Sequence, residues 1–276
     1  MKNLIDVREL RNRMTSGEHT VILDVRWQLG GPNGHEEYRK GHIPSAVYVD
    51  LDAELAAPPV AAEGRHPLPE ASLLEDAAQR WGIHPGDTVV VYDDWSSMAA
   101  ARAWWLLRDG GLDDVRVLDG GLGAWKGQGY EVDTGEETHS LGSVTLSPGN
   151  MPRLALEDVL EFAADNILLD ARAPERYRGE SEPVDPVAGH IPGALNAPTS
   201  ANVDEDGRFL DRGALADRFA FLGEHPGAEL AVYCGSGVSA AHEIFALDLI
   251  GKRAALYPGS WSQWSNHPEL PVATGA

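Results

Sequence analysis

The residues best suited to chemistry form the run Cys234-Gly235-Ser236-Gly237-Val238-Ser239, in which the single cysteine of the chain opens a glycine-rich loop. A short apolar strand is predicted just before this loop, and a helix is predicted just after it. Glycines let the backbone curl so that successive N–H groups converge, and a helix N-terminus adds positive charge there. A thiol in this place is expected to act as a thiolate nucleophile, with the N–H groups holding the anion that forms. The alternative is a buried structural cysteine beside a glycine-rich turn.

The loop belongs to the second of two similar halves of the sequence. The matching pairs are Leu23-Asp24-Val25-Arg26 with Leu169-Asp170-Ala171-Arg172, Gly41-His42-Ile43-Pro44 with Gly189-His190-Ile191-Pro192, Val91-Tyr92-Asp93 with Val232-Tyr233-Cys234, and Leu118-Asp119-Gly120 with Tyr257-Pro258-Gly259. Four matches in the same order indicate a duplicated domain. We therefore predict an N-terminal domain at 1–130, a linker at 131–152 that is rich in Gly, Ser, Thr and Pro, and a C-terminal domain at 153–276.

Each half alternates short apolar strands with segments of helical period. The predicted strands are Thr20–Asp24, Thr88–Tyr92, Val115–Leu118, Asn166–Asp170, Leu230–Tyr233 and Ala254–Tyr257. The predicted helices are Ala71–Trp81, Met98–Leu107, Gly213–Leu222 and Val238–Ile250. Continuous apolar strands that alternate with helices predict an α/β fold. We expect two tandem domains, each a mostly parallel sheet covered by helices on both faces.

Composition and charge exclude several classes of protein. The chain has 43 acidic and 22 basic residues and a formal net charge of −21, which argues against nucleic-acid binding. No apolar run is long enough for a membrane span, and the charged N-terminus does not read as a signal peptide, so a cytoplasmic location without a membrane partner is expected. One cysteine cannot form an intrachain disulfide, and the ten histidines lack metal-ligand spacing. We expect no metal and no cofactor.

These motifs resemble the rhodanese superfamily, specifically its tandem-domain sulfurtransferases, over nearly the whole chain. The two Leu-Asp-(Val/Ala)-Arg strands, the two Gly-His-Ile-Pro turns and the Cys234 loop carry the resemblance. It implies an active C-terminal domain and an inactive N-terminal copy, in which Asp93 stands at the position of Cys234. It also implies that Cys234 takes sulfur from a small anionic donor as a persulfide and passes it to a thiol, cyanide or protein-thiol acceptor. The N–H groups that would cradle the persulfide are those of Gly235, Ser236, Gly237, Val238 and Ser239.

The loop itself is similar to the mercaptopyruvate sulfurtransferase pattern Cys-Gly-Ser-Gly-Val-Thr, with Ser239 in place of the threonine. In that subfamily the serine belongs to a proton-handling group with the cysteine and a histidine supported by an aspartate. The resemblance therefore implies catalytic roles for Ser236, His66 and Asp52. The spacing between Asp52 and His66 is three residues longer than the family pattern.

The substrate-binding arginines match the mercaptopyruvate sulfurtransferase pattern only in part. Mercaptopyruvate enzymes hold their substrate with two arginines; Arg176 matches the first, whereas Val184 stands at the second and no nearby arginine replaces it. Thiosulfate and 3-mercaptopyruvate therefore both stay open as donors. A strongly negative protein that binds an anion needs a local positive group, for which Arg176 and Arg178 are the candidates. The resemblance also implies that Trp27 lies near the active cysteine, although plain packing is an equal alternative.

The repeat separates fold from function, because features shared by both halves are expected to be structural. Arg172 has a counterpart in Arg26, and His190 has one in His42, so all four are interpreted as structural residues. Cys234, Ser236 and Arg176 belong to one half alone and are interpreted as functional.

Two other functions are compatible with parts of the sequence. A phosphatase of the same fold would need an arginine at the end of the cysteine loop, where this sequence has Ala240 and Ala241, so phosphate-ester hydrolysis is disfavoured. The second rival is a persulfide carrier or regulatory binding protein that does not turn over small acceptors. A comparison of small and protein-thiol acceptors separates it from an enzyme.

Overall fold

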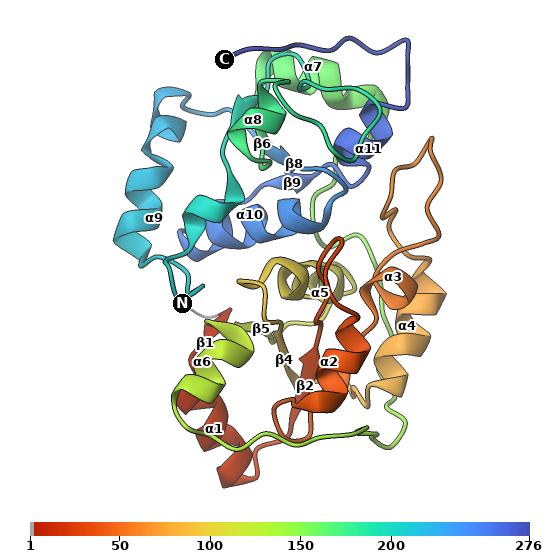
Figure 1. Ribbon diagram of the computed structural model, residues 1–276, viewed down its shortest axis with the longest axis vertical. Coiled ribbons are helices and arrows are strands. Elements are labelled where there is room, and N and C mark those ends of the chain that lie inside the picture. The colour runs from red at the N-terminus through yellow and green to blue at the C-terminus, as the bar shows by residue number, and fades with distance from the viewer. Residues whose placement is uncertain (1–2) are drawn as a thin grey trace. The chain divides into compact units, whose positions relative to one another are not determined.

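The computed structural model describes residues 3–276, and their contacts divide the chain into two compact units (Figure 1). Unit 1 contains residues 3–57, 69–151 and 203–209, and unit 2 contains residues 58–68, 152–202 and 210–276. Most of the predicted linker packs with unit 1; the Gly142 N–H, for example, donates to the Gln79 carbonyl at 2.7 Å. The boundaries at 130 and 152 stay a prediction. The structure adds that residues 58–68 fold with the second half of the sequence.

The centre of unit 1 is a parallel sheet with strand order β1-β5-β4-β2-β3. Its strands are β1 (Leu4–Ile5), β2 (Thr20–Asp24), β3 (Val47–Tyr48), β4 (Thr88–Tyr92) and β5 (Val115–Leu118). Its helices are α1 (Val7–Ser16), α2 (Gly34–Lys40), α3 (Leu51–Glu54), α4 (Ala71–Arg80), α5 (Met98–Asp109) and α6 (Gly121–Gly127). Because side chains alternate along a strand, Ile22 and Val90 join Leu10 of α1 and Trp125 of α6 in one apolar cluster. Helix α5 packs on β4 and β5 outside that cluster.

Unit 2 repeats the plan with strand order β7-β6-β8-β9, again all parallel. Its strands are β6 (Ile167–Asp170), β7 (Leu195–Asn196), β8 (Leu230–Tyr233) and β9 (Ala255–Leu256). Its helices are η1 (Leu156–Asp158), α7 (Val159–Asp165), α8 (Pro174–Tyr177), η2 (Thr199–Asn202), α9 (Arg212–Arg218), η3 (Ala220–Glu224), α10 (Val238–Leu249) and α11 (Ser260–Trp264). Helix α7 packs on β6, and α10 packs on β8 and β9 from the other side of the sheet in Figure 1. The predicted parallel α/β fold is confirmed.

One predicted helix, Gly213–Leu222, is divided in the structure. Helix α9 ends at Arg218 and the 3₁₀-helix η3 begins at Ala220. Phe219 lies between them with its ring almost fully buried. The helical period of the sequence does not show this break, because a 3₁₀ turn continues a similar apolar spacing.

Each unit contains the same buried ion pair at the carboxyl end of its central strand. Arg26 Nη2 lies 2.6 Å from Asp24 Oδ2 and also donates to the Gly41 carbonyl. Arg172 Nη2 lies 2.6 Å from Asp170 Oδ2 and donates to the Gly189 carbonyl. These bonds hold the strand end to the Gly-His-Ile-Pro turn in both halves, which supports the structural interpretation of both arginines.

The turn histidines behave alike as well. The ring of His42 stacks on Tyr38 with centroids 4.0 Å apart, and the ring of His190 stacks on Tyr177 at 3.8 Å. In each case Nδ1 of the histidine lies within hydrogen-bond distance of the tyrosine carbonyl oxygen. These contacts fix the turn locally and support a structural role for both histidines.

A buried carboxyl on α10 should make the stability of the fold depend on pH. Glu243 is completely buried and accepts from Asn202 Nδ2 at 2.6 Å, with Arg218 Nη2 at 3.3 Å. Burial, opposed by Arg218, raises the pKa of Glu243 to about 7. The folded protein therefore binds this proton more tightly than the unfolded chain does, so stability is lost as the pH rises from roughly 4.5 to 7.

We expect Glu243→Gln to remove this part of the pH dependence. Relative to the variant, the wild-type free energy of unfolding should fall by about 3 kcal/mol between pH 4.5 and 7.5. Urea unfolding of both proteins across that range measures the difference, with the exposed Glu224→Gln as the matched control. Parallel curves for wild type and Glu243→Gln would contradict the prediction.

Candidate active site

Cys234 lies directly after β8, in the loop that leads into α10. Its side chain is buried, and its Sγ accepts a hydrogen bond from the Gly237 N–H at 3.1 Å. Gly237 has a φ of 81°, and a Cβ there would lie 2.5 Å from the Pro258 carbonyl oxygen, so glycine is required on both grounds. The sequence thus turns the chain sharply enough for a backbone donor to reach the sulfur.

The turn between β9 and α11 is hydrogen-bonded to the cysteine loop. The Cys234 N–H donates to Ser260 Oγ at 3.1 Å, and the Cys234 carbonyl accepts from the Trp261 N–H at 2.9 Å. The Gly235 carbonyl accepts from the Ser262 N–H at 2.8 Å. These three bonds anchor the backbone of the cysteine loop at Cys234 and Gly235.

The structure brings His66 and Ser236 together, as the resemblance implied. Nδ1 of His66 lies 2.7 Å from Ser236 Oγ, and both side chains are buried. His66 belongs to the segment 58–68, which unit 2 holds through backbone bonds: the Arg65 N–H donates to Ser262 Oγ at 3.0 Å, and Gln263 Nε2 donates to the Ala62 carbonyl. A serine two residues after the cysteine therefore has a titratable partner.

Asp52 and Trp27 lie in unit 1 and are bonded to each other. Trp27 Nε1 donates to Asp52 Oδ2 at 2.9 Å, and the Trp27 ring contacts that of Trp95 with centroids 6.1 Å apart. His66 lies in unit 2 and bonds Ser236. The predicted roles of Asp52 and Trp27 at the active site stay predictions.

Arg176 and Arg178, which are two residues apart, have different surroundings. Nη2 of Arg176 lies 2.6 Å from Glu182 Oε1 and 3.2 Å from Asp185 Oδ2, and its Nη1 would lie 3.5 Å from a Cβ placed on Gly235. Arg176 is therefore beside the residue that follows the cysteine. Arg178 instead pairs with Glu180 at 2.8 Å, and both side chains are exposed. A substrate contact for Arg178 stays a prediction.

Sequence reasoning missed three residues of this site: Arg65, Glu182 and Asp185. Arg65 Nη1 forms an ion pair with Asp185 Oδ1, and its Nη2 would lie 3.0 Å from a Cβ on Gly235. Arg65 and Arg176 thus both lie beside Gly235, although the sequence has Val184 in place of the second arginine of the family pattern. Arg65 is far from Arg176 in sequence, and the one signal for it was its position directly before His66.

The carboxylates beside these arginines set the local charge. Burial disfavours the charged form of Glu182, but the hydrogen bonds from Arg176 and from two backbone N–H groups, with the charge of Arg176, together lower its pKa below the ordinary value. Burial raises the pKa of Asp185, opposed by the charge of Arg65. The positive charge that the sequence predicted near the cysteine is therefore largely balanced by neighbouring acids.

The same loop in unit 1 shows what its backbone geometry can hold. Asp93 occupies the position of Cys234, and its carboxylate accepts from the N–H groups of Trp95, Ser97, Ala99 and Ala100 at 2.8–2.9 Å. Burial, opposed by these bonds, raises the pKa of Asp93 to about 6, so the group is mostly ionised at pH 7. In the half that lacks cysteine, a side-chain anion fills the cradle.

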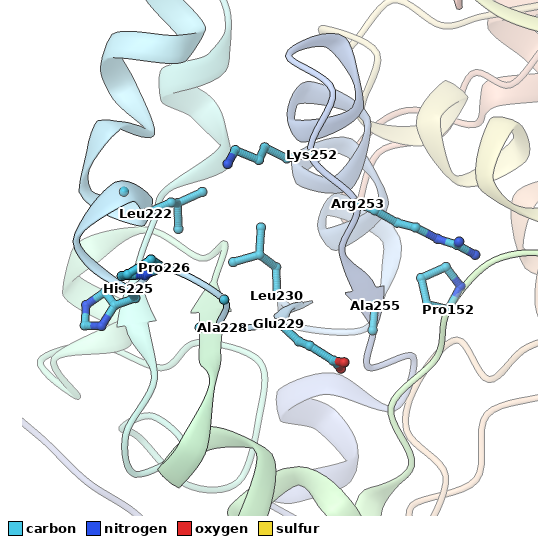
Figure 2. A pocket seen from close by; sticks show the side chains of 12 residues that line it. Pro152, Leu222, His225, Pro226, Ala228, Glu229, Leu230, Lys252, Arg253 and Ala255 are labelled. Carbon is cyan, nitrogen blue, oxygen red and sulfur yellow. The ribbon is translucent and has the colours of Figure 1, made fainter.

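A cavity of about 610 Å³ lies at the other end of the unit 2 sheet (Figure 2). Glu229 and Leu230 at the start of β8 line it, together with Lys252 and Arg253 just before β9. Lys252 and Arg253 point in different directions in Figure 2. Because its charged groups do not converge, this cavity is not assigned a ligand.

Two other features are absent from the described part of the chain. Residues 3–276 contain no group of three or more His, Cys, Asp and Glu side chains placed to bind a metal ion. None of the helices in that range is both long and apolar enough to span a bilayer.

The chain is similar to known proteins over nearly its whole length. A family model described as a rhodanese-like domain matches residues 6–128 and 155–267. A Mycobacterium tuberculosis protein named as a thiosulfate sulfurtransferase, SseB, is 47% identical over 275 residues, which are 99% of this chain and 97% of its own. A Pseudomonas aeruginosa protein named as a 3-mercaptopyruvate sulfurtransferase is 44% identical over 286 residues, which cover 99% and 98%. The crystal structure of SseA from Escherichia coli, described as a 3-mercaptopyruvate sulfotransferase, matches with a TM-score of 0.81 at 30% identity, covering 95% and 99%.

Proposed function

This chain belongs to the rhodanese family, and from that premise we propose that it is a sulfurtransferase in which Cys234 carries the transferred sulfur as a persulfide. The donor is thiosulfate or 3-mercaptopyruvate, the substrates named for its relatives in Mycobacterium tuberculosis and Pseudomonas aeruginosa. The acceptor is cyanide, a small thiol or a protein thiol. Because the nucleophile must stay reduced, a cytoplasmic location fits this function.

The observation that carries the proposal is the backbone cradle around Cys234. The Gly237 N–H already donates to Sγ. In unit 1 the equivalent loop directs four N–H groups at the carboxylate of Asp93. A loop that stabilises one anion by N–H donors can stabilise a thiolate or a terminal persulfide sulfur in the same way.

The reaction balances with either donor. The Cys234 thiolate attacks the outer sulfur, so that an S–S bond forms at Sγ. From thiosulfate the old S–S bond breaks and sulfite leaves. From 3-mercaptopyruvate the C–S bond breaks, the thiol proton moves to the carbon, and pyruvate leaves. An acceptor such as cyanide then takes the outer sulfur as thiocyanate and restores the thiolate.

The mercaptopyruvate reaction differs in needing a proton to move. The hydrogen bond between His66 and Ser236 supports a role for both in that transfer, since it supplies a titratable group beside the loop. We propose Asp52 as the support of His66, and Trp27 and Arg178 as further substrate contacts. Full activity of Asp52→Asn or Trp27→Phe would remove those residues from the site.

Mass spectrometry after donor treatment tests the function directly. We expect wild-type protein to gain the mass of one sulfur atom on Cys234 with at least one of the two donors, and to lose it when cyanide is added. Steady-state kcat/KM for thiosulfate and for 3-mercaptopyruvate, with cyanide as acceptor, then identifies the preferred donor. Protein that shows neither a persulfide nor turnover with either donor would refute the proposal.

The two rival functions give different results in the same assays. A persulfide carrier would load sulfur but pass it to a protein thiol and not to cyanide. A phosphatase is disfavoured because Ala240 and Ala241, both buried in the first turns of α10, offer no guanidinium to a phosphate. Turnover with cyanide and none with a phosphate ester is the expected pattern.

A further inference from the structure

Two guanidinium groups converge on Gly235, the residue that follows the nucleophile. A Cβ built on Gly235 would lie 3.0 Å from Arg65 Nη2 and 3.5 Å from Arg176 Nη1, with Arg176 Nη2 slightly farther at 3.8 Å. Arg176 comes from α8, whereas Arg65 comes from the segment 58–68 of the same unit. The two side chains are 20–25% exposed, so solvent reaches both.

We propose that Arg65 is a substrate-binding and specificity-determining residue, which forms with Arg176 a two-armed clamp for the anionic oxygens of the sulfur donor. The proposal rests on the proposed function, because it concerns the donor of that reaction. The ligand class is a small anion that carries several acceptor oxygens at the end away from its transferable sulfur. Sulfonate-type and carboxylate-type donors share this chemistry.

The atoms of the two arginines that lie nearest Gly235 are those without a protein acceptor. Among residues 3–276, Arg65 pairs with Asp185 through Nη1, and Arg176 pairs with Glu182 and Asp185 through Nε and Nη2. No acceptor in the described chain takes a hydrogen bond from Arg65 Nη2 or Arg176 Nη1, and the Arg65 Nε–H is buried without a partner. Guanidinium groups present five donors in a fixed plane, so an anchored edge leaves the other edge directed at a ligand.

Asp185 is the positioning residue of this clamp. Its Oδ1 pairs with Arg65 and its Oδ2 lies 3.2 Å from Arg176, while its own side chain is 3% exposed. One buried carboxylate therefore bridges both cations and keeps their free edges on the same side. It also offsets their mutual repulsion before a substrate arrives.

Several contacts that hold the segment 58–68 in place do not involve the Arg65 guanidinium. The segment 58–68 is held by other groups: the Arg65 backbone N–H on Ser262, the Ala62 carbonyl on Gln263, and Gly64 packed against the Gly259 carbonyl. Removing the guanidinium leaves all of these bonds in place. The side chain can therefore be changed without releasing the segment that carries His66.

The test compares Arg65→Ala and Arg65→Lys with Arg212→Ala, an exposed arginine at the start of α9. We expect Arg65→Ala to lower kcat/KM roughly 10- to 100-fold, mainly through a higher KM, as the loss of a charge-assisted contact predicts. Arg65→Lys keeps the charge and should recover part of the loss. Arg212→Ala should match wild type. Because Arg65→Ala also removes one partner of the buried Asp185 carboxylate, KM is measured at a temperature at which every variant is fully folded.

The change in KM decides whether Arg65 binds the donor. A KM increase with thiosulfate, with 3-mercaptopyruvate or with both supports the clamp and identifies the donor that it holds; pyruvate, as a competitive inhibitor lacking sulfur, should bind Arg65→Ala more weakly in the mercaptopyruvate case. An unchanged KM, or a loss confined to kcat and melting temperature, overturns the proposal. Persulfide formation in wild type, measured separately, shows whether the underlying function holds.

Discussion

Replacement of Cys234 by serine should reduce sulfur transfer to the level of a protein-free control with both donors. The serine hydroxyl is not ionised at neutral pH and forms no S–S bond, so the step that loads sulfur onto the protein is lost. Its oxygen can still accept from the Gly237 N–H, which approaches Sγ at 3.1 Å. The variant is therefore expected to keep the wild-type fold, and cyanide-dependent thiocyanate production is the measurement.

Two controls make this result interpretable. The melting temperature and far-UV circular dichroism of Cys234→Ser should match those of wild type. Its mass should not change after donor treatment, whereas wild type gains one sulfur. Because the chain has a single cysteine, sulfur on any other residue would not be a persulfide of the same kind. Substantial turnover by a folded Cys234→Ser protein would refute the mechanism.

Asp170→Ala should destabilise the protein by about 3–5 kcal/mol, the cost of removing one partner from a buried ion pair. Arg172 is 1% exposed, and its guanidinium donates to Asp170 through Nε and Nη2. Without the carboxylate this charge remains buried beside only the more distant Glu182, at 3.3 Å. Urea unfolding monitored by tryptophan fluorescence measures the change in the transition that contains unit 2.

The matched control breaks an arginine pair at the surface of the same unit. Glu180 pairs with Arg178 at 2.8 Å, but both side chains are exposed. Screening by water makes such pairs weak, so Glu180→Ala should leave the unfolding midpoint almost unchanged. Equal midpoints for Asp170→Ala and wild type would show that the shared Asp–Arg motif does not hold the fold together.

Much of the fold could be predicted because its signals are local. The apolar runs at 20–24, 88–92, 167–170 and 230–233 all became central parallel strands, and the duplicated motifs placed them in two similar sheets. The short strands β1, β3 and β7 were not predicted. Each contains two residues, which is too short for any periodicity, and each exists because a neighbouring strand supplies its hydrogen bonds.

In the candidate site, too, some residues could be predicted from the sequence and others could not. Cys234 and its glycines could be recognised in sequence, because the loop geometry follows from residues that are adjacent in the chain. The acids Glu182 and Asp185 carried no signal, since their importance comes from the arginines that they contact and not from their spacing. His66 was named through family resemblance, and its contact with Ser236 joins residues 170 positions apart.

By itself, then, the sequence determined a duplicated parallel α/β protein with one nucleophile in its second half. Strand period, glycine-rich turns and internal repeats are properties of short stretches of sequence. They can be recognised without knowing which distant residues are in contact. Only the tertiary structure decided which arginines lie beside the cysteine loop. It folds residues 58–68 into the second unit, where Arg65 and Arg176 both lie beside Gly235. A guanidinium acts through the direction of its N–H groups in space, and that direction is set by Asp185, which lies 120 residues away along the chain.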